Sequence, residues 1–344
     1  MSVEPSYDLD PAPPKATTAA PAGDCALAPE HPHFPVELPT PDIAPWLAGN
    51  TGIPGFHSFT ADAAGPHVLL LAVVHGNEIA GAIALDRLLA AGLRPQRGRL
   101  SLGFVNLAAY ARFDPHHPTA SRFIDEDLNR VWDAAVLDGR RRSVELDRAR
   151  EIRPMIESAD LLLDLHSMLW PSDPLMLCGP TPKGRALACA VGVPGLVVAD
   201  SGHSSGRRII DHVRFAEPNG GPAALLVEAG QHWAEPTVAT MLGAIGGLLR
   251  HAGVVESHPA LPVHPATARP RVAQVTMTVQ ATTSGFAFVQ PWRGGDVVAH
   301  RNTLIALDGT IEVRTPHDDY LLVMPSLRAS RGHTAVRLAQ FLPD

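Results

Sequence analysis

The 344-residue chain has few cysteines and no long apolar segment. Its three cysteines, Cys25, Cys178 and Cys189, are widely spaced, and no Cys-x-x-Cys pair occurs. This pattern excludes a disulfide-bonded scaffold and a zinc knuckle built from thiolates. No stretch of about 20 uninterrupted apolar residues occurs, so we expect no transmembrane helix and no membrane partner.

Positive charge is also scarce. The chain has 28 Lys and Arg against 35 Asp and Glu, a net charge of -7, and no long basic run. We therefore expect no nucleic-acid partner. The segment Met1–Pro13 is acidic and proline-rich and lacks the apolar core of a secretory signal, which predicts a cytoplasmic protein. The 45% share of hydrophobic residues predicts a sizeable packed core.

Strand-like and helix-like patterns alternate between residues 68 and 252, which predicts an α/β fold with a mixed central sheet. The expected strands in this part are 68–74, 100–106, 161–165, 196–199 and 223–227. The expected helices are 77–91, 143–158, 185–191 and 236–252.

The character of the sequence changes after His258. Residues 259–270 carry several prolines and no periodicity, which is typical of a linker. Short strand candidates with turns between them follow at 272–279, 285–289, 297–300, 303–306, 310–313 and 321–324. We therefore predict an N-terminal arm and extension over residues 1–60, an α/β domain over 61–258, and a small β-rich C-terminal domain over 259–344.

Three of the expected strands lead into side chains that can bind a metal or transfer a proton. His75 and Glu78 follow the first strand, His166 ends the strand at 161–165, and Glu228 ends the strand at 223–227. In open α/β sheets, ligands bind at the carboxyl ends of the strands. We therefore expect these four residues to meet at one edge of the sheet.

Two imidazoles and one carboxylate form a common catalytic zinc site, which leaves one position for water. His75, Glu78 and His166 supply this set, so the sequence predicts one Zn²⁺ per chain. Glu228 is left to take a proton from water. Asp164 lies on the same strand face as His166 and can orient its imidazole. As alternatives, Glu78 can stabilise the start of its helix, and Glu228 can pair with an arginine.

Arginines flank an acidic run in the segment from Arg122 to Arg130. Arg122 on one side, and Asn129 with Arg130 on the other, bracket Asp125–Asp127. Guanidinium groups suit the recognition of a carboxylate and the stabilisation of an oxyanion. The alternative is that these arginines only neutralise the neighbouring acids on a solvated loop.

Together these motifs resemble the succinylglutamate desuccinylase/aspartoacylase family, a branch of the zinc carboxypeptidase-like hydrolases. The matching segments occur in the family's order and are 75–78, 122–130, 164–167 and 227–230. The resemblance implies that residues 61–258 form a zinc hydrolase catalytic domain with a mixed α/β sheet. It also implies that the β-rich C-terminal domain narrows the pocket.

The resemblance further implies a role for each matching residue. The zinc ligands would be His75, Glu78 and His166. Glu228 would be the general base and acid, and Arg122 would polarise the scissile carbonyl. A substrate carboxylate would be held by Asn129 and Arg130.

Some pocket residues of the family have no single counterpart. A further substrate-binding arginine usually precedes the strand of the general base, and Arg207, Arg208 and Arg214 all compete for that position. Some members use a C-terminal tyrosine, for which Tyr320 is a candidate.

The expected activity is that of a zinc-dependent amidohydrolase, a deacylase that cleaves a small N-acyl amino acid to a carboxylate and a free amino acid. The alternative is a carboxypeptidase-type peptidase on the same scaffold, which a C-terminal domain covering the site would exclude. A non-enzymatic metal-binding protein would require a ligand or the base to be missing, and none is. The sequence leaves open the acyl group, the amino acid and whether the chain forms a homo-oligomer.

Overall fold

The structure is a computed structural model that describes residues 34–203, 205–219, 221–262 and 269–343. Residues Val36–Asp344 form one compact unit, separate from Met1–Pro35. The arm predicted at the start of the chain falls mainly outside the described residues. None of the helices in the described part combines the length and apolar character that a membrane span needs.

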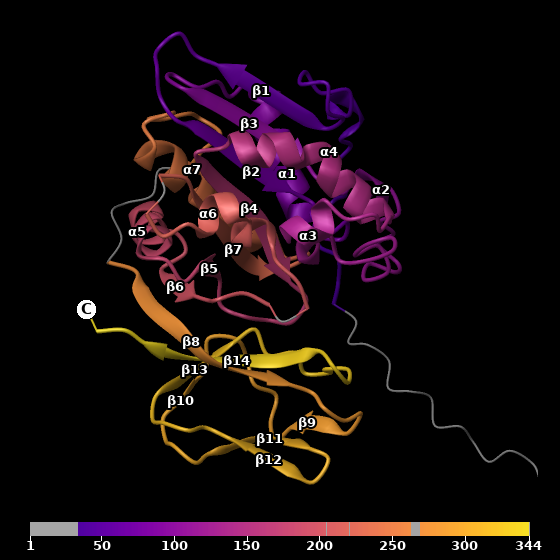
Figure 1. The fold of residues 1–344 in the computed structure, drawn as a ribbon, viewed down its shortest axis with the longest axis vertical. Coiled ribbons are helices and arrows are strands. Elements are labelled where there is room, and N and C mark those ends of the chain that lie inside the picture. The colour runs from indigo at the N-terminus through magenta and orange to yellow at the C-terminus, as the bar shows by residue number, and fades with distance from the viewer. Residues whose placement is uncertain (1–33, 204, 220, 263–268, 344) are drawn as a thin grey trace, which may run out of the picture. The chain divides into compact units, whose positions relative to one another are not determined.

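An eleven-stranded mixed sheet runs through the compact unit, in the order β1-β3-β2-β4-β7-β5-β6-β8-β14-β13-β10 (Figure 1). Its first seven strands in the chain are β1 (Phe56–Thr60), β2 (His67–Ala72), β3 (Arg99–Phe104), β4 (Leu161–Met168), β5 (Leu175–Cys178), β6 (Leu196–Ala199) and β7 (Ala223–Gln231). At its centre β3, β2, β4 and β7 run parallel, whereas β1 and β5 are antiparallel to their neighbours β3 and β7.

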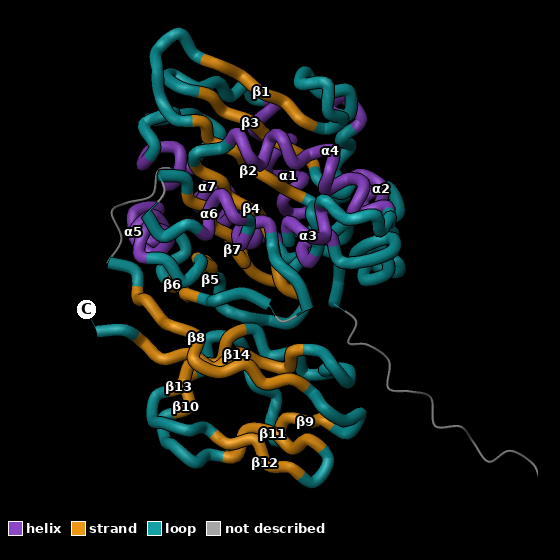
Figure 2. The backbone as a smooth tube through the Cα atoms, in the orientation of Figure 1, coloured by secondary structure: helices purple, strands orange, loops and turns teal. Residues whose placement is uncertain are grey.

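Helices connect these strands and pack on the sheet (Figure 2). They are α1 (Ile79–Ala90), α2 (Leu107–Tyr110), α3 (Ala134–Leu137), α4 (Val144–Ser158), α5 (Pro182–Val191), α6 (Val213–Ala216) and α7 (Glu235–His251). Three 3-10 turns, η1 (Ala44–Trp46), η2 (Leu128–Arg130) and η3 (Ile209–Asp211), complete the set. Helix α7 packs between α1 and α5, and α4 packs with α3 and η2.

Local signals in the sequence explain where the main helices begin. The Ser143 side chain accepts a hydrogen bond from the Leu146 backbone N–H at the start of α4, and Thr181 does the same for Gly184 in α5. Gly192 ends α5 in the left-handed conformation, with φ of 75°. The expected α/β alternation is confirmed, although β1, β5 and β14 have no counterpart among the predicted elements.

The described C-terminal part contains seven strands, of which β8, β10, β13 and β14 continue the main sheet. They are β8 (Arg271–Gln280), β9 (Phe286–Phe288), β10 (Val297–Val298), β11 (Leu304–Asp308), β12 (Ile311–Arg314), β13 (Tyr320–Val323) and β14 (Thr334–Phe341). Strand β8 pairs in parallel with β6, and β14 then pairs with β8. Strands β12, β11 and β9 form a separate three-stranded sheet. The β-rich character predicted for this part is confirmed, and the domain boundaries stay a prediction.

The hydrophobic core crosses from the α/β part into the C-terminal strands. One buried cluster joins Leu71 and Val198 of the first part with Ala273, Leu321 and Val323 of the second. A smaller cluster around Tyr320 and Ile305 lies within the C-terminal strands alone. The position of β14, beside β8 and β13, is therefore fixed by the main sheet and by its core.

Truncation after residue 258 tests this shared core. The shortened chain loses β8, leaves the backbone groups along β6 unpaired and exposes apolar side chains. Each buried Leu or Val that loses its cover should cost about 1.5–3 kcal/mol. We expect a lower urea midpoint of unfolding and increased aggregation. Full-length Ile311→Ala is the control, because Ile311 is 61% exposed. An unchanged midpoint in the truncated chain would contradict a shared core.

Candidate metal centre

His75, Glu78 and His166, the three predicted metal ligands, lie together at the carboxyl ends of the parallel neighbours β2 and β4. One ligand atom of each residue lies within 4.8 Å of those of the other two, and all three residues are buried. Glu78 Oε1 is 2.7 Å from His75 Nδ1, and Glu78 Oε2 is 3.1 Å from His166 Nδ1. The carboxylate thus stands between the two imidazoles.

The turn between β2 and α1 is shaped to present His75 and Glu78. Val73 has a φ of 51°, a strained conformation for a β-branched residue. A side chain at Gly76 would meet the carbonyl carbon of Ala109 at 2.3 Å, so only glycine fits beside His75. Glu78 is the N-cap of α1 but makes no capping hydrogen bond with its side chain. Its carboxylate faces the two imidazoles instead. The contacts of Glu78 therefore do not support the alternative that it mainly stabilises the start of α1.

The donor set has the chemistry of a zinc site. Two imidazole nitrogens and a carboxylate are ligands that zinc accepts in a tetrahedral arrangement. Burial by itself would raise the pKa of Glu78, but the imidazoles of His166 and His75 hold that pKa well below its ordinary value. Glu78 therefore carries the negative charge that a bound cation requires.

A second carboxylate stands behind each imidazole. Asp127 Oδ1 is 3.0 Å from His75 Nε2, and Asp164 Oδ2 is 2.9 Å from His166 Nε2. The Asp164 contact is electrostatic, because neither oxygen of Asp164 has an aligned donor among the described residues. Such carboxylates fix the ring orientation of metal-binding histidines. Asp164 has the neighbour expected from the sequence, whereas the contact of Asp127 with His75 was not predicted.

Glu228 lies on β7, directly beside His166 on β4 in the register of the two parallel strands. Its Oε2 atom is buried and has no hydrogen-bond partner among the described residues. Burial raises the pKa of Glu228 to about 8, with Glu78 adding to the rise and His166 and Arg122 opposing it. The group is therefore suited to accept and return a proton near neutral pH.

Arg122 reaches the same cluster from the loop before η2. One of its terminal nitrogens is 3.0 Å from His75 Nε2 and 3.2 Å from Asp127 Oδ2, and the other is 3.5 Å from Glu78 Oε1. Its side chain as a whole is 38% exposed. Arg122 therefore neutralises nearby acids and also presents donors at the edge of the cluster.

Asn129 and Arg130 have different surroundings. The Asn129 side-chain oxygen accepts a hydrogen bond from the Ile209 backbone N–H at 2.8 Å, and Asn129 Nδ2 is 3.3 Å from His166 Nε2. This amide ties η3 to β4. Arg130 donates to the backbone carbonyl of Asn129 at 2.7 Å. Burial lowers the pKa of Arg130 to about 10; Asp127 opposes this, and the charges of Arg122 and Arg208 add to it.

The three candidate arginines before β7 lie in different places. Arg208 is 3% exposed and is held by Asp200 and Asp211 at 3.0 and 2.7 Å. Arg207 pairs with Asp133 at 3.2 Å on the surface, and Arg214 donates to the Ala159 carbonyl at 2.6 Å. Of the three, Arg208 acts electrostatically on Arg130. The Tyr320 hydroxyl is 2.9 Å from Thr276 Oγ1, within the C-terminal core.

The sequence of residues 64–231 matches the succinylglutamate desuccinylase/aspartoacylase catalytic domain. This segment contains every residue placed above around Glu78. The segment therefore resembles the catalytic domain of the succinylglutamate desuccinylase/aspartoacylase family. The resemblance identified from the motifs is therefore confirmed, and the enzymes of this family are deacylating hydrolases.

Solved structures share the fold over most of the chain. A succinylglutamate desuccinylase/aspartoacylase from Rhodobacter sphaeroides has a TM-score of 0.60 and 21% identity, covering 84% of this chain and 89% of that one. Succinylglutamate desuccinylase from Vibrio cholerae has a TM-score of 0.61 and 16% identity, covering 84% and 86%. The ectoine utilization protein EutE from Ruegeria pomeroyi has a TM-score of 0.55 and 19% identity, covering 83% and 87%. No curated protein matched the sequence. At these identities the likeness shows the fold.

The matched segment also contains a buried acid that supports a loop of the site. Glu145, at the start of α4, has no exposed surface. Its carboxylate accepts hydrogen bonds from the backbone N–H groups of Ile124, Asp125 and Glu126 at 2.6, 3.0 and 3.3 Å. This one side chain therefore fixes the loop that carries Arg122 and Asp127 toward His75.

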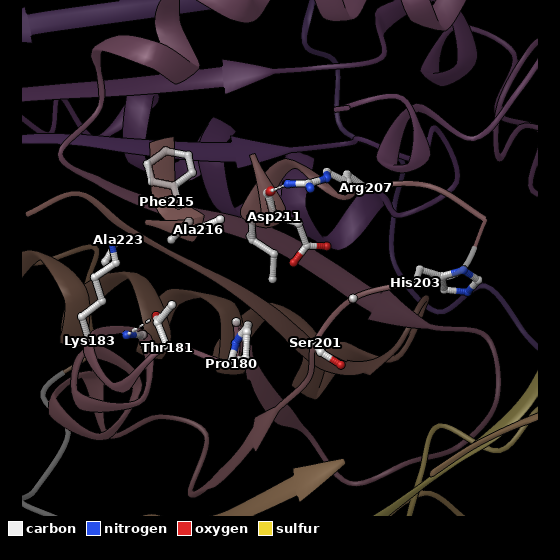
Figure 3. Close-up of a pocket in the computed structure, with 15 residues that line it drawn as sticks. Pro180, Thr181, Lys183, Ser201, His203, Arg207, Asp211, Phe215, Ala216 and Ala223 are labelled. Atoms are coloured by element: carbon white, nitrogen blue, oxygen red, sulfur yellow. Dashed lines mark hydrogen bonds between the residues drawn. The ribbon is translucent and has the colours of Figure 1, made fainter. Parts of the chain in front are cut away.

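Figure 3 shows a cavity of about 300 Å³. It is bordered by the loops after β5 and β6, by α5 and by η3 and α6, and labelled lining residues include Lys183, His203, Arg207 and Asp211. None of the three predicted metal ligands lines it.

Asp127→Asn tests the contact behind His75. We expect zinc affinity to fall about 10- to 100-fold, because the imidazole loses the carboxylate that orients it. Competition with a chromophoric chelator measures this affinity. Asp125→Asn is the matched control, since Asp125 accepts from the Val144 backbone N–H and not from a metal ligand. Equal zinc affinity in both variants would show that Asp127 does not support the metal centre.

Glu145→Gln tests the buried support of the loop. Its amide N–H groups would face backbone donors, so we expect a loss of about 1–3 kcal/mol in the free energy of unfolding and a lower kcat. Urea unfolding and steady-state kinetics measure the two effects. Glu151→Gln on the same helix is the control, because Glu151 pairs with Arg148 at the surface. A Glu145 variant as stable and active as the control would argue against this role.

Proposed function

We propose that the protein is a zinc-dependent amidohydrolase, on a zinc carboxypeptidase-like scaffold, that removes the acyl group from a small N-acyl amino acid. The observation that supports it most is the meeting of three buried metal-ligand side chains with Glu228, whose Oε2 atom has no partner among the described residues. The match of residues 64–231 to the catalytic domain of a deacylase family supports the class of reaction.

His75, Glu78 and His166 would hold the zinc ion. When bound, zinc supplies a Lewis acid that polarises a carbonyl group and lowers the pKa of a water molecule. The protein's own contribution is to keep the ligands fixed, which the contacts of His75 with Asp127 and of His166 with Asp164 support.

Glu228 would move the proton of the reaction. It accepts a proton from the water that attacks the acyl carbonyl carbon, and the same proton then passes to the nitrogen of the leaving amine as the carbon–nitrogen bond breaks. The products are a carboxylate and a free amino acid. A pKa raised by burial to about 8 suits a group that both accepts and donates a proton.

The arginines would orient the substrate. Arg122 has donors at the edge of the metal cluster, where they can bind the carbonyl oxygen as negative charge develops on it. Arg130 would bind a substrate carboxylate, since none of the described carboxylates forms an ion pair with it. Asn129 would donate one amide N–H to the substrate. Its side-chain oxygen accepts from the Ile209 backbone N–H and its Nδ2 lies near His166 Nε2, so the same amide would hold η3 beside β4.

Glu228→Gln tests the proposed proton transfer on a panel of N-acetyl and N-succinyl amino acids. The glutamine cannot accept the proton, so we expect kcat to fall about 10²- to 10⁴-fold with zinc content unchanged. Zinc removal by a chelator should abolish turnover, and added zinc should restore it. Exposed Glu235→Gln is the control. Undiminished turnover in Glu228→Gln or in the zinc-free protein would exclude the mechanism, and turnover of peptides alone would indicate a peptidase.

A further inference from the structure

His232 is a buried histidine that the proposed reaction does not use. It lies in the turn between β7 and α7, residues 232–234, and is 2% exposed. Its Nδ1 atom forms a hydrogen bond with Ser167 Oγ at 2.8 Å. The backbone N–H of the same serine donates to Glu78 Oε2 at 3.0 Å. His232 is therefore linked to the Glu78 carboxylate through a single residue, which directly follows His166 on β4.

The next residue of this β7–α7 turn contacts the other segment that carries predicted metal ligands. Trp233 is 1% exposed, and its indole N–H donates to the backbone carbonyl of Asn77 at 3.0 Å. Asn77 lies between His75 and Glu78 in the chain. Because a buried carbonyl is costly without a donor, this hydrogen bond restrains the backbone between the two ligands.

Further hydrogen bonds hold the turn itself in place. The His232 backbone N–H donates to the Met168 carbonyl at 2.9 Å, and the Trp233 backbone N–H donates to Gln231 Oε1 at 2.8 Å. Glu37, which lies outside the family-matched residues 64–231, donates its backbone N–H to the Trp233 carbonyl at 3.2 Å. The turn is thus fixed from three segments, and the two buried side chains extend from a restrained backbone.

The same turn continues the strand of Glu228, which lies four residues before His232. It therefore connects the proposed base with the two segments that carry the predicted metal ligands, the turn after β2 and the end of β4. We propose that the β7–α7 turn positions the metal ligands. Its His232 orients Glu78 through Ser167, and its Trp233 restrains the backbone beside that carboxylate. This proposal rests on the proposed function and adds two positioning residues to it.

Zinc affinity, measured by competition with a chromophoric chelator, tests the link through Ser167. His232→Leu removes the imidazole, and Ser167→Ala removes the hydroxyl group that it holds. We expect each change to lower zinc affinity about 10-fold and to shift the visible absorption of the cobalt-loaded protein. Because both act through one hydrogen bond, the double variant should lose no more than either single variant. His232→Asn keeps a polar amide near the position of Nδ1 and should retain most of the affinity.

Trp233→Phe tests the second contact, because phenylalanine keeps the ring but lacks the N–H, and zinc affinity should again fall about 10-fold. Two matched controls remove similar contacts that involve no predicted ligand. His67→Leu removes a buried histidine that bonds Ser101 Oγ at 2.8 Å at the start of β2. Trp46→Phe removes an indole N–H that donates to Asp86 Oδ1 at 2.7 Å. Both controls should lower the thermal midpoint of unfolding and leave zinc affinity unchanged.

The outcomes for the turn and for the reaction are distinct. Unchanged zinc affinity and cobalt spectra in the variants of the turn and of Ser167, or equal losses in the two controls, would overturn the proposal for the turn and leave the deacylase intact. If the wild type binds zinc but turns over none of the N-acetyl and N-succinyl amino acids, the proposed function fails, and the zinc affinities still decide the role of the turn. A wild type that binds no zinc would overturn both. If His232→Leu does not fold, Ser167→Ala decides in its place, because it removes only one hydroxyl group.

Discussion

The carboxylate of Glu78 joins the segments that form the site. One oxygen faces His75, the other faces His166 and accepts a hydrogen bond from the Ser167 backbone N–H at 3.0 Å, and Arg122 approaches at 3.5 Å. The β2–α1 turn, β4 and the loop before η2 therefore meet at a single charge. Because Glu78 is 2% exposed, that charge is stable only with these partners, and each segment is constrained by the others.

The partners of Glu78 are themselves held in place by further contacts. Asp127 stands behind His75 and also contacts Arg122, and Glu145 in turn holds the backbone of the loop that carries both. Each ionised group thus has a partner that is itself held in place. These contacts hold the predicted ligand side chains in place from several segments at once, as a preorganised site requires.

The sequence predicted the parts of the site that depend on local pattern. Long apolar runs marked the strands before His75, His166 and Glu228, and the carboxyl ends of parallel strands necessarily share one edge. It did not reveal what depends on contacts between distant segments. Asp127 was one of three consecutive acids, and only the fold of the loop selects it for His75. Strand β14 was missed because Arg337 interrupts its apolar pattern, and no neighbour in sequence explains a buried arginine there.

The strands near the Glu78 cluster and four of the C-terminal strands belong to one continuous sheet. The turn after β2 and the strands β4 and β7 carry the predicted metal ligands and Glu228, whereas β14 joins the sheet on its other side through β8 and β6. A substitution of Arg337 on β14 can therefore leave the predicted metal ligands in place, because the Arg337 side chain contacts Asp200 and not the Glu78 cluster. The C-terminal strands therefore complete the sheet and share its core, while the predicted metal ligands depend on contacts between the β2–α1 turn, β4 and the loop before η2.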